Sequence, residues 1–370
     1  MSLSVVEPPL VRHYVAGGSE HGGGIGRLVG YVRAAPERRH SHKLTDTRGV
    51  AWSARRSPLV LARAMLVMLG QRIVAPSCVH QLHIAGRGST ARKTLLGLWA
   101  QVLGARYVMH LHDYDYATDF GRRPAWQRAA VRRVFARASR VIVLGQRDRL
   151  TAERLLGVTP GRVSILRNCV PDPGPPQPAA GGDVHIVFLG QLGPRKGVPE
   201  LLDALSGPAL PATGWRATLA GNGAVDEVRR TVEACGLSDR IRVPGWLGLS
   251  ETQALCASAQ ILVLPSHAEG FAMAVLEGLA HGLAVVTTRV GAHGEAMEHD
   301  RQCLFVPVGD ARALGETLAR LVGDGALRAR LSAEARRLFL SEFAIGGYVA
   351  RLERLLGDLG AGVVTEWKSA

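Results

Sequence analysis

The sequence predicts an α/β protein built from two doubly wound parallel sheets. Apolar stretches alternate with amphipathic helical stretches along the chain, which is the pattern of parallel strands covered by helices. This alternation occurs twice, and residues 171–183 separate the two runs. That segment holds five prolines and three glycines, which exclude a helix or a central strand. We therefore interpret it as a linker between two domains.

The first domain is expected over residues 1–170. Five apolar stretches predict its strands, at residues 10–16, 79–85, 106–112, 140–145 and 162–167. Two arginine-rich stretches, residues 53–72 and 121–140, carry the spacing of amphipathic helices.

The second domain is expected over residues 184–342. Its predicted strands are residues 184–190, 216–221, 240–245, 261–265 and 284–288, with a possible further strand at 304–308. Helices are expected at residues 310–322 and 326–343. A last amphipathic segment lies within residues 343–370 and carries Leu352, Leu355, Leu356 and Leu359 on one face.

Composition limits the classes of protein that fit. A chain of 370 residues is long enough for two domains with separate cores. The five cysteines are scattered and odd in number, which favours reduced thiols in a cytoplasmic protein. The first residues lack the basic and long apolar regions of a secretory signal, and no segment has roughly 18 uninterrupted apolar residues that would indicate a membrane span.

The net charge of +14 is concentrated in the first domain. Residues 1–170 carry 27 Lys and Arg against 9 Asp and Glu, whereas the remainder carries 18 against 22. A one-sided excess of this kind indicates a surface that docks on a polyanion, either anionic lipid or nucleic acid.

We favour lipid because the basic residues accompany apolar helical stretches. In residues 121–140 a helical wheel gathers Trp126, Ala130, Val131, Val134 and Phe135 on one half, between arginines. Residues 53–72 join an apolar stretch to terminal arginines, and both segments fit interfacial binding without spanning. The alternative is that each helix packs its apolar face on the sheet of its own domain. The expected location is the cytoplasmic face of the plasma membrane.

Two carboxylates stand eight positions apart around a predicted junction of strand and helix. Residues 261–265 predict a buried strand, which places Glu269 on the following loop and Glu277 within the next helix. Ligands of parallel sheets bind outside the carboxyl ends of the strands, where helix N-termini attract anions. Carboxylates accept hydrogen bonds from sugar hydroxyls and repel phosphate. The pair therefore indicates a ligand that carries hydroxyls as well as phosphates.

The surrounding residues, P-S-x-x-E-G-F-x-x-x-x-L-E-G-x-A-x-G-x-x-V-V from Pro265 to Val286, resemble the E-x7-E signature of the retaining GT-B glycosyltransferases of family 4. The resemblance implies two Rossmann-like domains facing across a cleft, with the C-terminal helix crossing back onto the first domain. It places Glu269 by the hydroxyls of the donor sugar and Glu277 by the ribose of the nucleotide. Gly270 and Phe271 belong to the same donor-binding motif.

Adjacent cations follow the first strand of the second domain, in residues 188–197. Arg195 and Lys196 stand at the mouth of the next helix, where cations stabilise the charge that develops on a departing diphosphate. The segment resembles the family pattern G-R-L-x-x-x-K-G, with Gln191 in place of the arginine. This departure puts the clamp of two cations in doubt, although Arg195 can compensate.

His112 ends the predicted strand at residues 106–112. The resemblance places it by the donor sugar, and an imidazole at a strand end can donate to a sugar hydroxyl beside the bond that breaks. His110 and Asp113 are weaker candidates for the same role. The aspartates at positions 113, 115 and 119 could form a metal cluster with these histidines, but their spacing matches no metal-ligand motif, so no metal site is expected.

Several glycine-containing loops are further candidates for the donor site. Residues 19–27 resemble the N-terminal glycine loop of the family, with Gly23 and Gly24 as the contacts, and a glycine-rich turn lets backbone N–H groups approach phosphate. Gly221 lies in a segment that resembles the G-x-G loop, and Glu295 takes the position of the acid in the G-x-x-E segment. Residues 83–93 are rich in small and basic residues, and we expect them to hold a phosphate of the acceptor.

By this resemblance the chain is expected to be a metal-independent retaining glycosyltransferase without a bound cofactor. It would move a hexose from a nucleoside-diphosphate sugar to a carbohydrate or a polyprenyl-diphosphate-linked saccharide in bacterial exopolysaccharide or other cell-surface polysaccharide synthesis. A sugar-nucleotide epimerase of the same fold and a non-catalytic polyanion-binding protein are the alternatives. A nicotinamide-dependent oxidoreductase is not favoured, because no complete G-x-G-x-x-G with a following acid is well placed.

Overall fold

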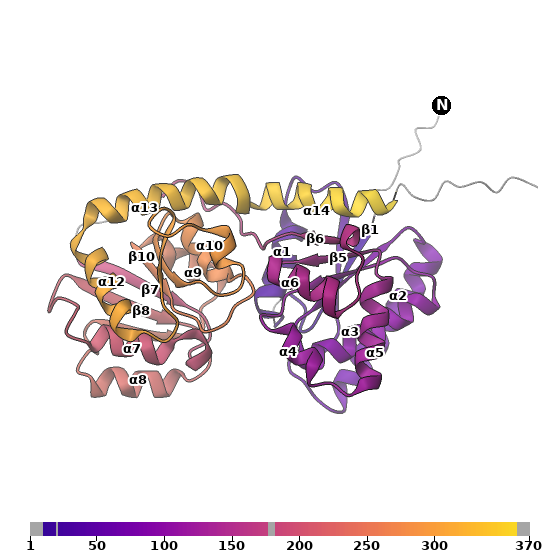
Figure 1. Ribbon diagram of the computed structural model, residues 1–370, viewed down its shortest axis with the longest axis horizontal. Helices are drawn as coiled ribbons and strands as arrows, with labels where there is room; N and C mark the ends of the chain where they lie inside the picture. Colours follow the sequence, from indigo (N-terminus) through magenta and orange to yellow (C-terminus); the bar gives the residue numbers. More distant parts are fainter. Residues whose placement is uncertain (1–9, 20, 177–181, 361–370) are drawn as a thin grey trace, which may run out of the picture. The chain divides into compact units, whose positions relative to one another are not determined.

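The computed structural model describes residues 10–19, 21–176 and 182–360. These residues form two compact units (Figure 1). Unit 1 ends at Arg167 and also includes the C-terminal helix from Ile345, whereas unit 2 extends from Asn168 to Ala344. Glu20 of the predicted glycine loop, residues 177–181 of the predicted linker and residues 361–370 of the predicted C-terminal segment lie outside the described residues.

Unit 1 contains a six-stranded parallel sheet in the order β2-β1-β3-β4-β5-β6. Its strands are β1 (Leu10–Val15), β2 (Ser41–Asp46), β3 (Val79–Ile84), β4 (Tyr107–Leu111), β5 (Arg140–Val143) and β6 (Val163–Ile165). Five of them lie where the sequence predicts strands.

Strand β2 is missing from the sequence prediction. Its residues, S-H-K-L-T-D, contain Leu44 as the single large apolar side chain, so they lack the apolar run on which the prediction rests. The strand lies at the edge of the sheet, and its side chains are mostly half-buried. An edge strand that exposes one side can be polar in this way.

Helices cover both faces of this sheet. They are α1 (Gly23–Ala34), α2 (Arg56–Val74), α3 (Arg87–Val102), α4 (Tyr116–Gly121), α5 (Ala125–Arg137), α6 (Gln146–Leu150) and α14 (Ile345–Gly360), with short helical turns η1 (Thr151–Leu155) and η2 (Pro160–Arg162). Figure 1 shows α1 and α14 on one side of the sheet and α3 and α5 on the other.

The two faces of the sheet differ in chemistry. Alternate residues of the strands, among them Tyr14, Leu82 and Met109, form an apolar core with α2, α3 and α5. The residues between them point to the opposite face. There, His13 on β1, His83 on β3 and other histidines are buried beneath α1 and α14.

The C-terminal helix α14 belongs to unit 1 and packs against α1. Val349, Leu352 and Leu356 are fully buried on its inner face. Glu353 on the same face accepts hydrogen bonds from the backbone N–H groups of Arg39 and His40, at 2.7 and 2.8 Å. The C-terminal helix thus completes unit 1, although more than 170 residues of the chain separate it from the rest of that unit.

The two basic helical segments differ in what they bury. On α5, Val131, Val134 and Phe135 are buried in the core, so this part of the apolar half packs on its own domain, whereas Trp126 is 71% exposed. On α2 the apolar side chains are largely exposed, and only 17% of its most apolar window is buried. By length and composition alone α2 is one helix that could cross a membrane, although Arg63 interrupts it.

Unit 2 contains a second six-stranded parallel sheet, in the order β12-β11-β10-β7-β8-β9. Its strands are β7 (Val184–Leu189), β8 (Trp215–Ala220), β9 (Ile241–Gly245), β10 (Ile261–Leu264), β11 (Ala284–Thr288) and β12 (Cys303–Val306). The strands match the six stretches expected from the sequence, including the possible last one. The two parallel sheets confirm the predicted fold class.

The helices of unit 2 follow its strands in order. They are α7 (Val198–Ser206), α8 (Val225–Ala234), α9 (Leu249–Ala257), α10 (Met273–Ala280), α11 (His293–Ala296), α12 (Ala311–Gly323) and α13 (Gly325–Leu338), with short turns η3 (Pro194–Lys196) and η4 (Phe339–Phe343). Asp310 and Asp324 cap α12 and α13 by accepting from backbone N–H groups at 2.8 Å.

The packing of α14 makes a testable prediction about stability. Leu352→Ala should lower the free energy of unfolding of unit 1 by about 2–5 kcal/mol, because Leu352 is fully buried and its removal leaves a cavity. Urea unfolding measures this loss. Leu66→Ala is the matched control, since Leu66 is 66% exposed in the same unit and should change stability by about 0.5 kcal/mol or less. Equal effects of the two variants would contradict the burial of α14.

Candidate functional site

The candidate site of unit 2 lies at the carboxyl edge of its sheet. Strands β11, β10 and β7 are neighbours and parallel, so the loops that follow them emerge side by side. These loops are residues 190–197 after β7, 265–272 after β10 and 289–292 after β11. They contain five of the residues that the sequence predicts for the donor site, Arg195, Lys196, Glu269, Gly270 and Phe271.

Glu269 is the centre of this arrangement. Its carboxylate is 9% exposed, and the ammonium group of Lys196 donates to its Oε1 at 2.5 Å. The hydroxyl of Ser266 donates to the same oxygen at 2.7 Å. A buried carboxylate needs such partners because burial removes its hydration. The structure therefore brings together two residues that the sequence prediction had placed in one site from separate loops.

Arg195 lies on the same loop as Lys196. Its Nη1 donates to the carbonyl oxygen of Ala268 at 2.9 Å and lies 3.6 Å from Glu269 Oε1. A backbone hydrogen bond also joins the two loops, in which the N–H of His267 donates to the carbonyl oxygen of Arg195 at 2.9 Å. Two basic side chains thus face one carboxylate, which leaves an excess of positive charge at the loop for an anionic ligand.

Three glycines allow these loops to approach one another. Gly197 has a φ of +71°, and a Cβ there would come within 2.1 Å of the carbonyl oxygen of Pro265. At Gly291, with a φ of +54°, a Cβ would lie 2.1 Å from the carbonyl oxygen of Glu269. At Gly221 it would overlap the carbonyl of Gly190. Any side chain at these positions would push the loops apart, so the glycines are required for the site geometry.

Helix α10 follows the loop of Glu269 and is almost fully buried. Glu277 lies on it, 8% exposed, and Gly270 and Phe271 are buried immediately before it. Asn168 donates to the carbonyl of Phe271 at 2.9 Å. A glutamate with so little exposure in an apolar helix fits a structural or ligand-binding role, and its predicted contact with ribose stays a prediction.

Sequence reasoning overlooked His293, the first residue of α11. Its ring is fully buried, its Nε2 accepts from the N–H of Ala272 at 3.3 Å, and its Nδ1 lies 3.2 Å from the carbonyl oxygen of Thr288. Burial lowers the pKa of His293 to about 4, so the ring is neutral and Nδ1 carries the proton. His293 holds the start of α10 against the end of β11. The sequence G-A-H-G-E, in which His293 stands between two glycines close to a predicted donor loop, could have indicated this residue.

One predicted contact, Glu295, and the position at which the chain departs from the family pattern, Gln191, are both exposed. Glu295 lies on α11, and Gln191, which replaces the arginine of the family pattern, lies after β7. Lys196 and Arg195, by contrast, both reach Glu269. In this chain the basic charge beside the carboxylate therefore comes from two consecutive residues of one loop.

The candidate residues of unit 1 also lie at the carboxyl edge of a sheet. Gly23, with a φ of +60°, begins α1, and Gly24 follows it, both exposed. Within the described residues no side chain caps the first N–H groups of α1, a region that excludes Glu20. Such N–H groups can bind an anion. Their contact with a donor stays a prediction.

Asp46 organises the glycine loop from the neighbouring strand. Its Oδ1 accepts from the N–H groups of Gly17 and Arg48, at 2.7 and 2.8 Å, and its Oδ2 accepts from Gly49 at 2.9 Å. Sequence reasoning overlooked this residue because it overlooked β2, whose last residue it is.

His112 follows the last residue of β4. Its Nε2 lies 2.9 Å from Nδ1 of His83, and its backbone N–H donates to the carbonyl of Ile84 at 2.8 Å. Burial lowers the pKa of His112 to about 3, so the imidazole is neutral at physiological pH. His110 is completely buried beneath it, where Nδ1 lies 2.9 Å from Nε2 of Gln81. His112 is thus the histidine that stands at the edge of the sheet.

Two of the aspartates after β4, Asp115 and Asp119, pair with different arginines. Asp119 forms an ion pair with Arg123 at 2.8 Å, and Asp115 lies 3.2 Å from Arg147. A different group, His83, His110 and His112, brings one nitrogen from each ring within 4.8 Å of the others. The sequence suggests His110 and His112 only together with the aspartates as a metal cluster, and it does not indicate His83, which comes from the neighbouring strand β3.

The segment 83–93, predicted to hold an acceptor phosphate, contains Lys93 in the middle of α3. Its side chain is fully buried and donates to the hydroxyl of Thr47 at 2.6 Å. Burial lowers the pKa of Lys93 to about 7. The phosphate contact stays a prediction.

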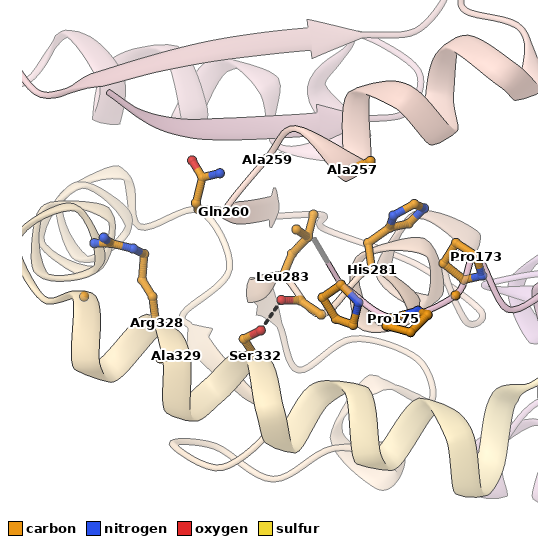
Figure 2. Close-up of a pocket in the computed structure, with 14 residues that line it drawn as sticks. Pro173, Pro175, Ala257, Ala259, Gln260, His281, Leu283, Arg328, Ala329 and Ser332 are labelled. Carbon is orange, nitrogen blue, oxygen red and sulfur yellow. Dashed lines mark hydrogen bonds between the residues drawn. The ribbon is translucent and has the colours of Figure 1, made fainter. Parts of the chain in front are cut away.

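A pocket of about 330 Å³ lies elsewhere in unit 2 (Figure 2). Gln260 and Leu283 line it just before β10 and β11, so it is at the amino edge of the sheet, opposite Glu269. Prolines of the linker and Ser332 of α13 form other walls, and Ser332 donates to the carbonyl of Gly282. The pocket lies between the linker and α13, away from the candidate donor site around Glu269.

Comparisons with known proteins agree with the resemblance. Residues 183–324 match the family model described as glycosyl transferases group 1. An exopolysaccharide phosphotransferase of Streptomyces coelicolor is 30% identical over 223 residues, 59% of this chain and 23% of the relative. A glycogen synthase of Mycobacterium tuberculosis is 27% identical over 66% of this chain and 62% of its own length. The chain therefore spans less than two thirds of these relatives.

A solved structure shares the fold of the whole chain. The HepE protein of Anabaena, in complex with UDP and glucose, has a TM-score of 0.73 at 16% identity and covers 94% of this chain and 100% of its own. At this identity the likeness shows the fold alone, and it confirms the predicted GT-B class.

The buried histidines of unit 1 predict a loss of stability in mild acid. Burial lowers the pKa of His42 to about 4 and that of His112 to about 3. Below about pH 6.5 the unfolded chain binds protons that the folded unit does not. The free energy of unfolding should therefore fall by about 1.4 kcal/mol per pH unit for each such histidine as the pH drops from 6.5 towards 4.

Hydrogen exchange of the amides in β3 and β4 measures this stability between pH 7.5 and 5.5, after correction for intrinsic exchange rates. His112→Asn is the matched variant, because it should remove about one proton from the pH dependence. A flat profile, or the same slope in the variant, would contradict neutral burial.

Proposed function

We propose that this chain, which belongs to the glycosyl transferases group 1 family, moves a hexose from a nucleoside-diphosphate sugar to a hydroxyl group of a saccharide acceptor. The observation that carries the proposal is the contact between Glu269 and Lys196 at 2.5 Å, with Arg195 beside them. These residues lie in the segment that matches the family model. The HepE protein, which has the same fold, was solved with UDP and glucose and supports a nucleotide-sugar donor.

Each residue of the loop cluster has a role that fits this donor. Lys196 and Arg195 bind the diphosphate and stabilise the negative charge that grows on it as the sugar leaves. Glu269 accepts hydrogen bonds from sugar hydroxyls. Glu277 binds the ribose, and the N–H groups near Gly270 and Gly291 border the donor.

The proposed transfer retains the configuration of the sugar. The bond between the anomeric carbon and the diphosphate oxygen breaks, and the acceptor oxygen forms its bond on the same face. The acceptor proton passes to the departing phosphate oxygen. The reaction therefore requires neither a protein nucleophile nor a separate protein base. His112, at the carboxyl edge of the sheet of unit 1, is proposed to bind a hydroxyl group of the substrate. Basic side chains supply the charge stabilisation, so the proposal includes activity without a divalent metal.

Synthesis of a cell-surface polysaccharide is the proposed context. The relative in Streptomyces coelicolor carries a name that refers to exopolysaccharide. The excess of positive charge in residues 1–170 fits an acceptor carried by polyprenyl diphosphate in an anionic membrane. The relatives named above are transferases or synthases, so they do not favour an epimerase.

An exposed apolar stripe on α2 supports docking on the cytoplasmic face of that membrane. Leu59, Leu66 and Ile73 are spaced by seven residues, which places them on one side of the helix, and they are 70%, 66% and 74% exposed. Arg63 and Arg72 are exposed on the same helix. Leucines with flanking arginines are typical of helices that lie in the membrane interface.

The next helix, α3, also exposes apolar side chains. Leu95 and Val102 are exposed on α3, again seven residues apart, and α3 packs beside α2. Soluble proteins rarely expose contiguous apolar surface without a partner. We assign this surface to lipid rather than nucleic acid because α2 and α3 expose large apolar side chains and α2 exposes arginines beside them.

Glu269→Gln should lower kcat by about 10²–10³ with the fold intact, because the amide cannot accept from sugar hydroxyls as a carboxylate does and no longer pairs with Lys196. Transfer from a radiolabelled donor measures the loss. Glu298→Gln is the control, since Glu298 is an exposed glutamate outside the loop cluster. Near-normal turnover of Glu269→Gln would remove Glu269 from the site.

The donor and the metal requirement are testable together. A thermal-shift screen against UDP-, GDP- and ADP-sugars should show one donor that raises the melting temperature, because a ligand that binds the folded state stabilises it. Transfer with that donor should survive an excess of chelator. A strict requirement for a divalent cation would count against the proposed charge stabilisation by Lys196 and Arg195.

Replacing Leu59, Leu66 and Ile73 together by serine should lower binding to vesicles with anionic lipid by at least tenfold. The change removes apolar area that would enter the interface, whereas the basic residues remain. Sedimentation with vesicles measures binding. The matched control replaces Leu340, which is 50% exposed in unit 2, by serine. Unchanged sedimentation of the triple variant would contradict docking through α2.

A further inference from the structure

Four histidines, of which His13, His42 and His83 are buried and His112 is half-buried, form a continuous chain across the sheet of unit 1. His112 Nε2 lies 2.9 Å from His83 Nδ1, and His83 Nε2 lies 3.0 Å from His13 Nδ1. His13 Nε2 lies 2.9 Å from His42 Nδ1. The chain runs from the residue after β4 through β3 and β1 to β2, on the face that α1 and α14 cover. Each ring uses one nitrogen toward each neighbour.

Glu353 of α14 terminates this chain. Its Oε1 lies 3.5 Å from His42 Nε2, and it also accepts from two backbone N–H groups, those of Arg39 and His40. Burial alone would raise the pKa of Glu353, but these two N–H groups and the neighbouring His40 and His42 outweigh it and lower the pKa below its usual value. Glu353 is therefore a carboxylate at neutral pH, which only accepts hydrogen bonds.

All four imidazoles are neutral. Burial lowers the pKa of each of them, and the nearby Arg33 and Lys93 lower those of His13 and His83 further. A neutral imidazole has one N–H and one lone pair, so it donates from one nitrogen and accepts at the other. A chain of such rings has only two arrangements without a mismatched contact, in which every proton points the same way.

The carboxylate selects one of these arrangements. At 3.5 Å the contact is long for a hydrogen bond, but a lone pair on His42 Nε2 would face negative charge there, so Nε2 carries the proton. His42 Nδ1 must then accept from His13, His13 from His83, and His83 from His112. Each ring is protonated on Nε2. His112 is left with an unprotonated Nδ1.

We propose that Glu353 sets the tautomer of His112 through this chain of four imidazoles, so that His112 presents a hydrogen-bond acceptor at the edge of the sheet. Glu353 is thus a positioning residue that acts on the site from the C-terminal helix. The inference rests on the proposed function for its consequence in catalysis. It also changes the expected role of His112, which accepts from a substrate hydroxyl instead of donating to it.

The same histidines could be considered ligands of a metal ion, since nitrogens of His83, His110 and His112 lie within 4.8 Å of one another. Both nitrogens of His83, however, already face other imidazoles at 2.9 and 3.0 Å. These are hydrogen-bond separations. A metal would require His83 to leave one of these contacts, so the geometry favours the hydrogen-bonded chain.

Nitrogen-15 NMR of histidine-labelled protein without substrate tests the proposal, because protonated and unprotonated ring nitrogens resonate far apart. The His112 signals are assigned from their loss in His112→Asn. In the wild type His112 should be protonated on Nε2 alone. In Glu353→Gln the amide can donate to His42 as well as accept, so a substantial fraction of His112 should shift to the Nδ1-protonated form.

Glu37→Gln is the matched control. Glu37 is an exposed carboxylate beside the start of α14 and outside the histidine chain, so its removal should leave the His112 spectrum unchanged. A wild-type His112 protonated on Nδ1, or identical His112 spectra in wild type and Glu353→Gln, would overturn the proposal. Binding of added Zn²⁺ with loss of the His83 and His112 proton signals would overturn it as well.

Activity measurements separate this inference from the proposed function. Glu353→Gln should lower kcat/KM for transfer by about three- to tenfold, the size of one altered hydrogen bond, and Glu37→Gln should not. The NMR result stands whether or not the chain transfers a sugar. A shifted tautomer with no detectable transfer by the wild type would contradict the function alone, and an unshifted tautomer with active transfer would contradict the relay alone.

Discussion

The buried carboxylate of Glu269 is the interaction on which the candidate site depends. A carboxylate with 9% of its side chain exposed must be compensated, and Lys196 and Ser266 do this at 2.5 and 2.7 Å. The contact joins the loop after β7 to the loop after β10. Gly197 and Gly291 let the backbones come close enough for it to form. The same charges that satisfy Glu269 without a ligand are suited to a sugar diphosphate.

Unit 1 also buries polar side chains, among them neutral histidines. Its sheet buries histidines on one face, where charged rings would lose their hydration, and pairs them with one another and with Glu353. The C-terminal helix supplies the carboxylate that ends the chain. Packing of α14 is therefore both a contribution to stability and a means of fixing which nitrogens carry protons. In unit 2 the polar residues around Glu269 lie on the loops that follow the strands. In unit 1 the histidines lie mainly on one face of the sheet.

The sequence was sufficient for the parts of the fold that depend on local pattern. Buried strands such as β7 and β10 are continuous apolar runs, and the two glutamates of the donor motif follow one of them. It was insufficient where tertiary contacts decide. Strand β2 is polar because it lies at an edge, so Asp46 was overlooked with it. The histidine chain joins residues from three strands, the loop after a fourth strand and one distant helix, and no spacing along the sequence indicates it.

A crystal structure with the nucleoside diphosphate of the preferred donor tests the central claim most directly. The account predicts diphosphate oxygens within hydrogen-bond distance of Lys196 Nζ and the Arg195 guanidinium, with Glu269 directed to the sugar position. A nucleotide bound at the amino edge of the sheet, in the pocket near Gln260 and Ser332, would contradict it. So would a diphosphate held by a metal ion with Lys196 still paired to Glu269.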